Sequence, residues 1–301
     1  MKNLGTPALM VGININVSSS AITLDQAHYI RQVAKTFGQL AAAPVTCPAS
    51  NHGCLGPPAA ADTTSSTPLD TSTCPYLSLV GCLLWITITR PDVAVAVSRA
   101  CQHSRAPTTA HWRAAIRILR YLRTTSHFTL SYDRSVRPVI VFGYADAAFA
   151  NESGMRSRYG HALYLSGCLV SWLTKSTTAV CLSTAEVEYV AAAEATKDIV
   201  WLRNLLAELG FPQSSPSRLF EDNQACVAMV RNHLVTGRNR HFCVKMAWLR
   251  QQVTNKVVTL LFVASRNNLA DILTKILVNL LHQALAKGLL GPKDVSPRGG
   301  C

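Results

Sequence analysis

Three aspartates occupy positions in the sequence where a carboxylate is expected to have a definite structural or chemical role. Asp146 follows the apolar run 139–145, which predicts a strand, and a carboxylate at the end of a buried strand needs a partner or a metal ion unless it faces solvent. Asp222 lies where a predicted strand passes into a helix, and Asp271 opens the last predicted helix. Either of these two could instead serve only as a helix N-cap.

A fourth candidate acid comes from a pair of glutamates near the start of a long predicted helix, 184–209. Ser183 and Glu186 form the pattern S-x-x-E, a capping box, so Glu186 already has a structural role. Glu188 is rotated about 200° from Glu186 around the helix and points elsewhere. Glu188 is therefore the glutamate available for a site.

These acids belong to one α/β segment, where strand ends and helix starts can converge on a cleft. Four hard oxygen donors suit Mg²⁺, with Mn²⁺ as a substitute, and would be very unfavourable without a cation. Two such ions about 4 Å apart can clamp a phosphodiester while water attacks in line. We expect carboxylates within about 8 Å of one another from Asp146, Glu188, Asp222 and Asp271.

The elements between residues 138 and 275 predict a mixed α/β sheet with helices packed on it. Ser166-Gly167, between two β-rich runs, predicts a hairpin, and Gly210 ends the long helix. The expected order is a strand at 139–145, hairpin strands at 161–165 and 169–173, a helix at 184–209, a strand at 218–221, helices at 223–231 and 241–253, a strand at 257–263, and a last helix through Asp271.

The chain before residue 138 has another organisation. Residues 41–75 are rich in Ala, Pro, Ser, Thr and Gly, which predicts a flexible linker that does not pack. The other expected elements are a strand at 8–17, a helix at 23–37, and a helical block at 74–121, broken at Thr89-Arg90-Pro91 and at Ala106-Pro107.

The composition of the chain limits the classes of molecule that it is expected to bind. The net charge of +13 over 301 residues favours a polyanion, nucleic acid first. The longest apolar run, 79–88, is too short to span a bilayer, and no leader pattern is present, so a cytoplasmic or nuclear protein without a membrane partner is expected. The ten cysteines contain no C-x-x-C pair, which favours free, mostly buried thiols.

One predicted helix, 111–123, carries an arginine stripe. Arg113, Arg117 and Arg120 fall at i, i+4 and i+7, with Arg123 nearby. The stripe could be an ordinary solvated face. However, four arginines with no intervening acid should repel one another, and a nucleic-acid backbone lying along that face would relieve the repulsion.

Several short motifs follow one another in the second half of the chain. They are Gly-Tyr-Ala-Asp-Ala (143–147), Val-Ser-Trp (170–172), Leu-Ser-Thr-Ala-Glu-Val-Glu-Tyr (182–189), Trp-Leu-Arg-Asn-Leu-Leu (201–206), Glu-Asp-Asn-Gln-Ala (221–225), Arg-His (240–241) and Ala-Asp-Ile-Leu-Thr-Lys (270–275). Together they resemble the ribonuclease H domain of copia-type retrotransposon Pol polyproteins.

The resemblance continues upstream, through Leu79-Val80-Gly81, Thr89 to Ala94 and His111 to Leu122, which look like the region between polymerase and ribonuclease H. Lys2 to Gly5 resembles the segment just after the polymerase palm. The resemblance implies a C-terminal Pol fragment with a ribonuclease H-like mixed sheet flanked by helices, preceded by a mostly helical remnant of the reverse-transcriptase thumb and connection.

By the same resemblance, the four acids map onto metal-binding carboxylates for two Mg²⁺ ions, and the activity is hydrolysis of the RNA strand of an RNA–DNA hybrid. Asp146 and Asp222 would anchor the metals, Glu188 would hold one metal and orient the RNA 2′-hydroxyl, and Asp271 would complete the second site. The missing polymerase portion of the polyprotein is a further implied partner.

This chain departs from the patterns of the family and of related enzymes at several positions. It has no Asp-Asp pair, so no polymerase activity is expected from it alone. Ala148 stands where the family has a second acid, followed by Phe149 in place of Trp. The loop 264–270 also lacks the His that cellular ribonucleases H often place there to help product release. Two alternatives to an active nuclease stay open: a non-catalytic, nucleic-acid-binding remnant, and a subunit that completes a separately encoded polymerase.

The expected organisation has five parts. They are a palm/thumb remnant at 1–40, the linker at 41–75, a helical connection region at 76–137, the ribonuclease H-like domain at 138–275, and a C-terminal tail at 276–301.

Overall fold

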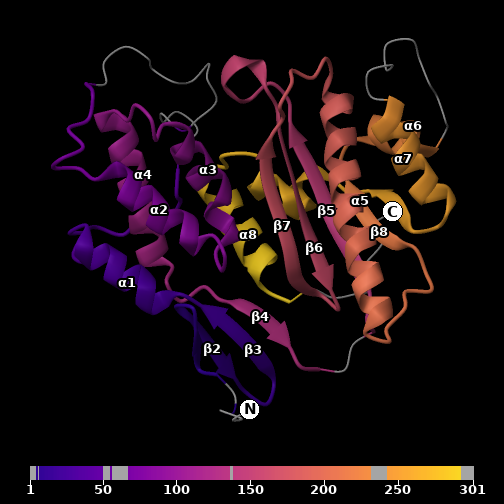
Figure 1. Cartoon of the computed structure of the whole chain (residues 1–301), viewed down its shortest axis with the longest axis horizontal. Coiled ribbons are helices and arrows are strands. Elements are labelled where there is room, and N and C mark those ends of the chain that lie inside the picture. The colour runs from indigo at the N-terminus through magenta and orange to yellow at the C-terminus, as the bar shows by residue number, and fades with distance from the viewer. Residues whose placement is uncertain are drawn as a thin grey trace. The chain divides into compact units, whose positions relative to one another are not determined.

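The computed structural model describes residues 5, 7–49, 55, 67–135, 138–231 and 243–292. The chain forms two compact units, each with its own sheet and apolar core (Figure 1). Unit 1 contains Met1–Ser135 and Ile276–Pro292, and unit 2 contains Val136–Lys275 and Lys293–Cys301. Within the described residues, no helix is both long enough and apolar enough to cross a membrane.

Unit 1 combines helices with a four-stranded antiparallel sheet in the order β1-β2-β3-β4. Its strands are β1 (Leu9–Met10), β2 (Ile13–Val17), β3 (Ala21–Asp25) and β4 (Leu130–Asp133). Its helices are α1 (Ala27–Thr36), α2 (Tyr76–Ile86), the 3-10 turn η2 (Pro91–Val93), α3 (Ala94–Gln102), α4 (Thr109–Thr124) and α8 (Asn279–Leu290). Both predicted breaks of the helical block are confirmed.

The first predicted elements are wrong in detail. The chain turns at Val11 and Gly12, both with positive φ (50° and 76°), so the predicted single strand is a hairpin. Residues 23–25, expected in a helix, instead pair with β2 and with β4, more than 100 residues later. Helix α1 therefore begins only at Ala27.

The expected linker also differs from its prediction. Residues 41–49 contain no helix or strand, yet they pack: the side chains of Val45, Cys47 and Ala49 are buried. Pro44 and Pro48 therefore disfavour regular structure here without keeping the apolar side chains out of the core. Residues 50–54 and 56–66 lie outside the described residues.

The Thr-Arg-Pro-Asp segment, residues 89–92, contributes two charged side chains to a buried polar cluster in unit 1. The Arg90 guanidinium donates to both carboxylate oxygens of Asp92, at 2.8 and 2.7 Å, and the Tyr121 hydroxyl donates to the same carboxylate at 2.8 Å. His282 of α8 lies 3.1 Å from the Asp92 carbonyl oxygen. The sequence 276–301, expected to be a tail, thus includes a helix that packs into unit 1.

Unit 2 is built on a five-stranded mixed sheet, and it confirms the predicted α/β class. The sheet order is β7-β6-β5-β8-β9, with β5 in the centre, antiparallel to β6 and parallel to β8. Its strands are β5 (Val141–Ala148), β6 (Arg158–Leu165), β7 (Cys168–Ser176), β8 (Ser217–Glu221) and β9 (Val258–Phe262). Its helices are α5 (Thr184–Glu208), α6 (Gln224–Arg231) and α7 (Cys243–Thr254), with 3-10 turns η3 (Ser153–Met155), η5 (Ser265–Asn267) and η6 (Leu269–Leu273).

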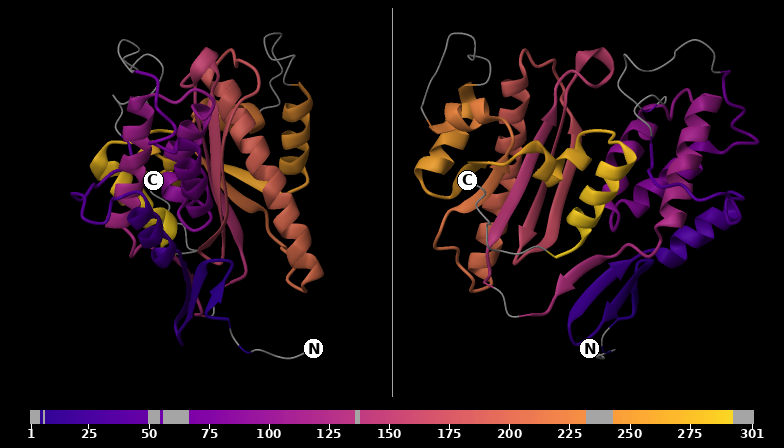
Figure 2. Two further views of the ribbon diagram at one scale, coloured as in Figure 1. Left: turned by 60° about the vertical axis from the view of Figure 1, so that its left-hand side comes forward. Right: turned by 180° about the vertical axis from the view of Figure 1, so that it is seen from behind.

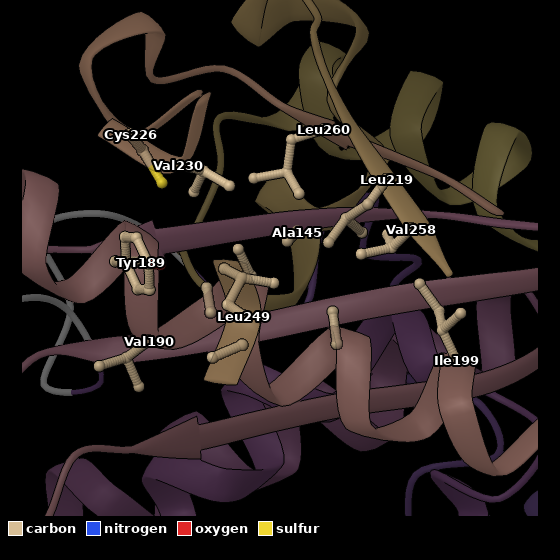
Figure 3. Packing of buried hydrophobic residues seen from close by; sticks show 14 of the residues in the cluster. Ala145, Tyr189, Val190, Ile199, Leu219, Cys226, Val230, Leu249, Val258 and Leu260 are labelled. Atoms are coloured by element: carbon tan, nitrogen blue, oxygen red, sulfur yellow. The ribbon is translucent and has the colours of Figure 1, made fainter. Parts of the chain in front are cut away.

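Helix α5 lies along one face of this sheet, with α6 and α7 beside it (Figures 1 and 2). Ala191, Ala192 and Ala195 are fully buried, and such small side chains let the helix backbone approach the strands closely. Figure 3 shows Ile199 of α5 in one apolar cluster with Leu219 of β8. This packing holds α5, and the glutamates on it, in a fixed position relative to the sheet.

Candidate active site

Asp146 lies within the central strand β5. The strand continues to Ala148, so Asp146 is not at its end as the sequence predicts, and its side chain is fully buried. The Thr274 hydroxyl donates to one carboxylate oxygen of Asp146, and the Lys275 ammonium donates to the other at 3.1 Å. Asp146 therefore does not face solvent but points into a polar, closed environment.

Of the two glutamates of α5, Glu186 takes part in the helix start, as predicted, and Glu188 lies elsewhere. The Ser183 hydroxyl accepts a hydrogen bond from the Glu186 backbone N–H at 3.2 Å, and Glu186 Oε2 accepts one from the Leu182 N–H at 2.5 Å. Glu186 thus helps to cap the start of α5, although its carboxylate accepts a hydrogen bond from the Leu182 N–H and not from the Ser183 N–H as in a full capping box. Glu188 is 4% exposed, and its Oε2 has no hydrogen-bond partner among the described residues.

Asp222 is not a helix cap. Asn223 takes that role, since its Oδ1 accepts a hydrogen bond from the Cys226 N–H at 2.9 Å. The half-buried Asp222 joins Asp146 and Glu188 instead: one carboxylate oxygen from each of the three lies within 4.8 Å of the others. Strand β5, helix α5 and the end of β8 meet at this point.

Asp271 comes from the short 3-10 turn η6 rather than from the start of a helix. The cap of η6 is Asn268, whose Oδ1 accepts from the Ala270 N–H at 3.1 Å and whose Nδ2 donates to the Ala145 carbonyl at 2.9 Å. This second bond ties η6 to β5 next to Asp146. Asp271 Oδ1 accepts from Lys275 Nζ at 2.6 Å.

Asp271, the fourth acid, is thus linked to Asp146 by the Lys275 ammonium, which binds both carboxylates. The bonds of 2.6 and 3.1 Å from Lys275 limit the two oxygens of Asp271 and Asp146 to a separation of about 5.7 Å at most. Gly160, paired with Asp146 across β5 and β6, makes room for this arrangement. A Cβ at Gly160 would lie 3.0 Å from Leu273 Cβ, in the turn that carries Asp271.

Two site residues were missed from the sequence. Glu221 is fully buried at the end of β8, and strand alternation places it on the same face as the buried Leu219, which was a readable signal. Lys275 lies four residues after Asp271, a spacing at which opposite charges meet on a helical segment. Both bear directly on the charge balance of the site.

Burial makes this cluster electrostatically unfavourable. It raises the pKa of Asp146 to about 8, because Lys275 offsets only part of the effect and Asp271 adds to it. Burial, then the charges of Asp146 and Asp222, raise the pKa of Glu188 to about 9. The pKa of Glu221 is raised well above its ordinary value by burial and by Glu188.

The donor set fits a divalent cation. All ligand atoms are carboxylate oxygens, which Mg²⁺ and Mn²⁺ prefer, and three of them are already gathered. A cation at this position would oppose the rise in the pKa of Asp146 and Glu188 that burial and the neighbouring carboxylates cause.

The arginine stripe has a role that the sequence did not show. Three of the four guanidinium groups bind the segment that precedes them in unit 1, and Arg113 is exposed. The bonds are Arg117 to Cys47 Sγ at 3.3 Å, Arg120 to the Ala43 carbonyl at 2.8 Å, and Arg123 to the Leu40 and Ala42 carbonyls at 2.8 and 2.5 Å. Arg120 and Arg123 thus have backbone carbonyl partners within unit 1, and Arg117 has a thiol partner.

Comparisons with known proteins show which proteins this chain is similar to. No protein-family model matches the chain. The chain is 34% identical over 295 residues to a retrovirus-related Pol polyprotein from transposon TNT 1-94 of Nicotiana tabacum, which covers 97% of this chain and 22% of the relative. It is 29% identical over 291 residues to that of transposon RE2 of Arabidopsis thaliana, covering 96% and 19%. The chain thus spans about a fifth of these relatives.

Solved structures with some likeness are ribonuclease H domains. The N-terminal RNase H domain of a Mycobacterium tuberculosis protein is 16% identical, with a TM-score of 0.35, and the match covers 50% of this chain and 98% of that one. LC11-RNase H1 in complex with an RNA/DNA hybrid is 14% identical, with a TM-score of 0.34, and the match covers 45% and 96%. From its similarity to the transposon polyproteins over nearly its whole length, the chain belongs to the Pol polyproteins of copia-type retrotransposons.

Proposed function

We propose that unit 2 hydrolyses the RNA strand of RNA–DNA hybrids with the help of two divalent cations, as the ribonuclease H part of a Pol polyprotein. The observation that carries the proposal is the group formed by Asp146, Glu188 and Asp222, whose ligand atoms lie within 4.8 Å of one another. Carboxylates buried this closely oppose folding unless a cation joins them.

Each acid has a distinct proposed role. Asp146 and Asp222 hold the cations, Glu188 holds one of them and orients the 2′-hydroxyl of the RNA, and Asp271 completes the second position. When bound, the cations stabilise the negative charge of the phosphodiester and make a water molecule more acidic. The 2′-hydroxyl is the feature that distinguishes an RNA strand from a DNA strand at the cut site.

Further contacts belong to the same proposal. The net charge of +13 favours the polyanionic hybrid, and the exposed Arg113 is the member of the stripe that we retain as a phosphate contact. The polymerase portion of the longer polyprotein is the proposed protein partner.

The test is cleavage of a labelled RNA–DNA hybrid in Mg²⁺, with double-stranded DNA as the substrate that should stay intact. Asp222→Asn should abolish cleavage, because an amide does not supply the anionic ligand that a hard cation requires. It should keep hybrid binding, since it removes a negative charge near the phosphates. Glu208→Gln, exposed at the far end of α5, is the matched control and should cut like the wild type.

Two results would contradict the proposal. If the wild type binds the hybrid and never cuts it, the chain is a nucleic-acid-binding remnant, an alternative for which Ala148 in place of a second acid is the supporting feature. If Asp222→Asn cuts as fast as the wild type, the acid cluster does not perform the chemistry.

A further inference from the structure

Lys275 is the cation that the structure places inside the acid cluster. Its Nζ lies 3.1 Å from Asp146 Oδ1 and 2.6 Å from Asp271 Oδ1, so one ammonium bridges the two carboxylates. The side chain of Lys275 is 36% exposed, whereas those of Asp146 and Asp271 are 0% and 9% exposed. The ammonium therefore reaches buried acids from a stem that is partly in solvent.

The position of this ammonium matters because Asp146 belongs to two groups at once. With Glu188 and Asp222 it forms the three-carboxylate group, and with Asp271 it forms the pair that Lys275 bridges. A divalent cation coordinated by both Asp146 and Asp271 would lie between these two carboxylates, where the ammonium now lies. An ammonium and a divalent cation this close together repel each other strongly in a site of low dielectric constant, so each weakens the binding of the other there.

We propose that Lys275 is a built-in countercharge that occupies the position between Asp146 and Asp271, competes there with a divalent cation, and moves away when that cation binds. This inference rests on the proposed function for the presence of cations. Lysine suits the role, since its ammonium is a compact charge on a flexible four-carbon stem that can turn into solvent. The partial exposure of Lys275 leaves it a direction in which to move.

Two opposite consequences follow from this competition. Without divalent cations, Lys275 stabilises the fold by compensating two buried carboxylates. With cations, it weakens the binding of the ion that needs Asp271, while a cation held by Glu188, Asp222 and Asp146 is affected less. The chain should therefore bind two cations with unequal affinities.

The experiment compares the whole chain with Lys275→Met and with Lys245→Met as the control. Lys245 is a matched residue because its ammonium lies 2.9 Å from Glu194 and its side chain is 43% exposed, but it bridges no acid of the cluster. Calorimetric titration with Mn²⁺ and Mg²⁺ measures the affinities, and thermal unfolding in EDTA measures the cation-free stability.

Lys275→Met should bind the weaker of the two cations at least about tenfold more tightly than the wild type, because it removes a full positive charge from the ion's position. In EDTA its Tm should fall by more than that of Lys245→Met, and saturating Mg²⁺ should remove this deficit. Cation affinities in Lys275→Met that equal or fall below those of the wild type would overturn the inference.

A second variant covers the case in which Lys275→Met folds poorly. Asp271→Asn combined with Lys275→Met removes the charge pair together, so it should recover most of the Tm lost in EDTA while losing the weaker cation. A double variant no more stable than Lys275→Met would also overturn the inference. None of these readouts uses cleavage, so an inactive wild type that still shows the competition would refute the proposed function alone.

Discussion

Glu188→Gln should stabilise the cation-free protein at alkaline pH while weakening its cation binding. The pKa of Glu188 is raised from 4.5 to about 9, so between these values the folded chain keeps a proton that the unfolded chain releases. Stability therefore falls as pH rises through this window. One pH unit corresponds to about 1.4 kcal/mol per proton, so at pH 8 this group opposes folding by up to about 5 kcal/mol.

The expected gain is smaller than this limit, because Asp146 titrates together with Glu188 and takes up part of the effect. A glutamine of nearly the same shape carries no proton to keep, so about 2–5 kcal/mol should be recovered at pH 8 and almost none near pH 4.5. For a chain of this size the Tm should rise by roughly 5–15 °C at pH 8.

The assay is thermal unfolding in EDTA at pH 5 and pH 8, repeated in saturating Mg²⁺. Glu186→Gln is the control: Glu186 accepts the Leu182 N–H and lies outside the three-acid group, so its substitution should bring no gain at pH 8. Mg²⁺ should remove the advantage of Glu188→Gln, since it stabilises only a chain that binds it. A variant less stable than the wild type at pH 8, or equally shifted at both pH values, would refute the reasoning.

Two further substitutions test how the site and unit 1 are held. Gly160→Ala would place a Cβ 2.7 Å from the Leu173 carbonyl oxygen and 3.0 Å from Leu273. We therefore expect the free energy of unfolding to fall by about 1–3 kcal/mol and Mg²⁺ binding, measured by titration, to be at least tenfold weaker. Unchanged Mg²⁺ binding would show that η6 need not pack so closely against β6. Arg120→Ala should speed limited proteolysis of the segment 41–49 and cost about 1 kcal/mol, because it removes the bonds to Ala43. The exposed Arg113→Ala is its control, and equal cleavage rates in the two variants would contradict this role.

Local signals explain what the sequence could predict. The hairpin turn at Ser166 and Gly167 has positive φ at both residues (52° and 84°), as such a turn requires, and Gly210 follows the end of α5 with a φ of 85°. Glu188 was separated from Glu186 by helical geometry and a capping pattern alone. These features depend on residues a few positions apart, which a single sequence contains.

Features that depend on distant partners were not predictable. The pairing of β3 with β4 joins segments more than 100 residues apart, and no local sequence pattern near Ala21 predicts it. The partners of Arg120 and Arg123 are backbone carbonyls, which any residue type supplies and which therefore leave no pattern in the sequence. The docking of Asn268 against β5 was not predictable for the same reason, because its side-chain amide donates to the Ala145 backbone carbonyl.

The acid cluster shows why residue type and spacing could indicate the site before the fold was known. A carboxylate inside a central strand opposes folding, and Asp146 is compensated only in part by Lys275. An asparagine or glutamine would relieve that opposition at each acid without disturbing the packing. A chain that places Asp146, Glu188 and Asp222 together therefore departs from what stability alone favours, and such departures are expected at functional sites. This conflict between burial and charge favours a cation at these acids, and it is a property of the chain itself that similarity to other proteins does not supply.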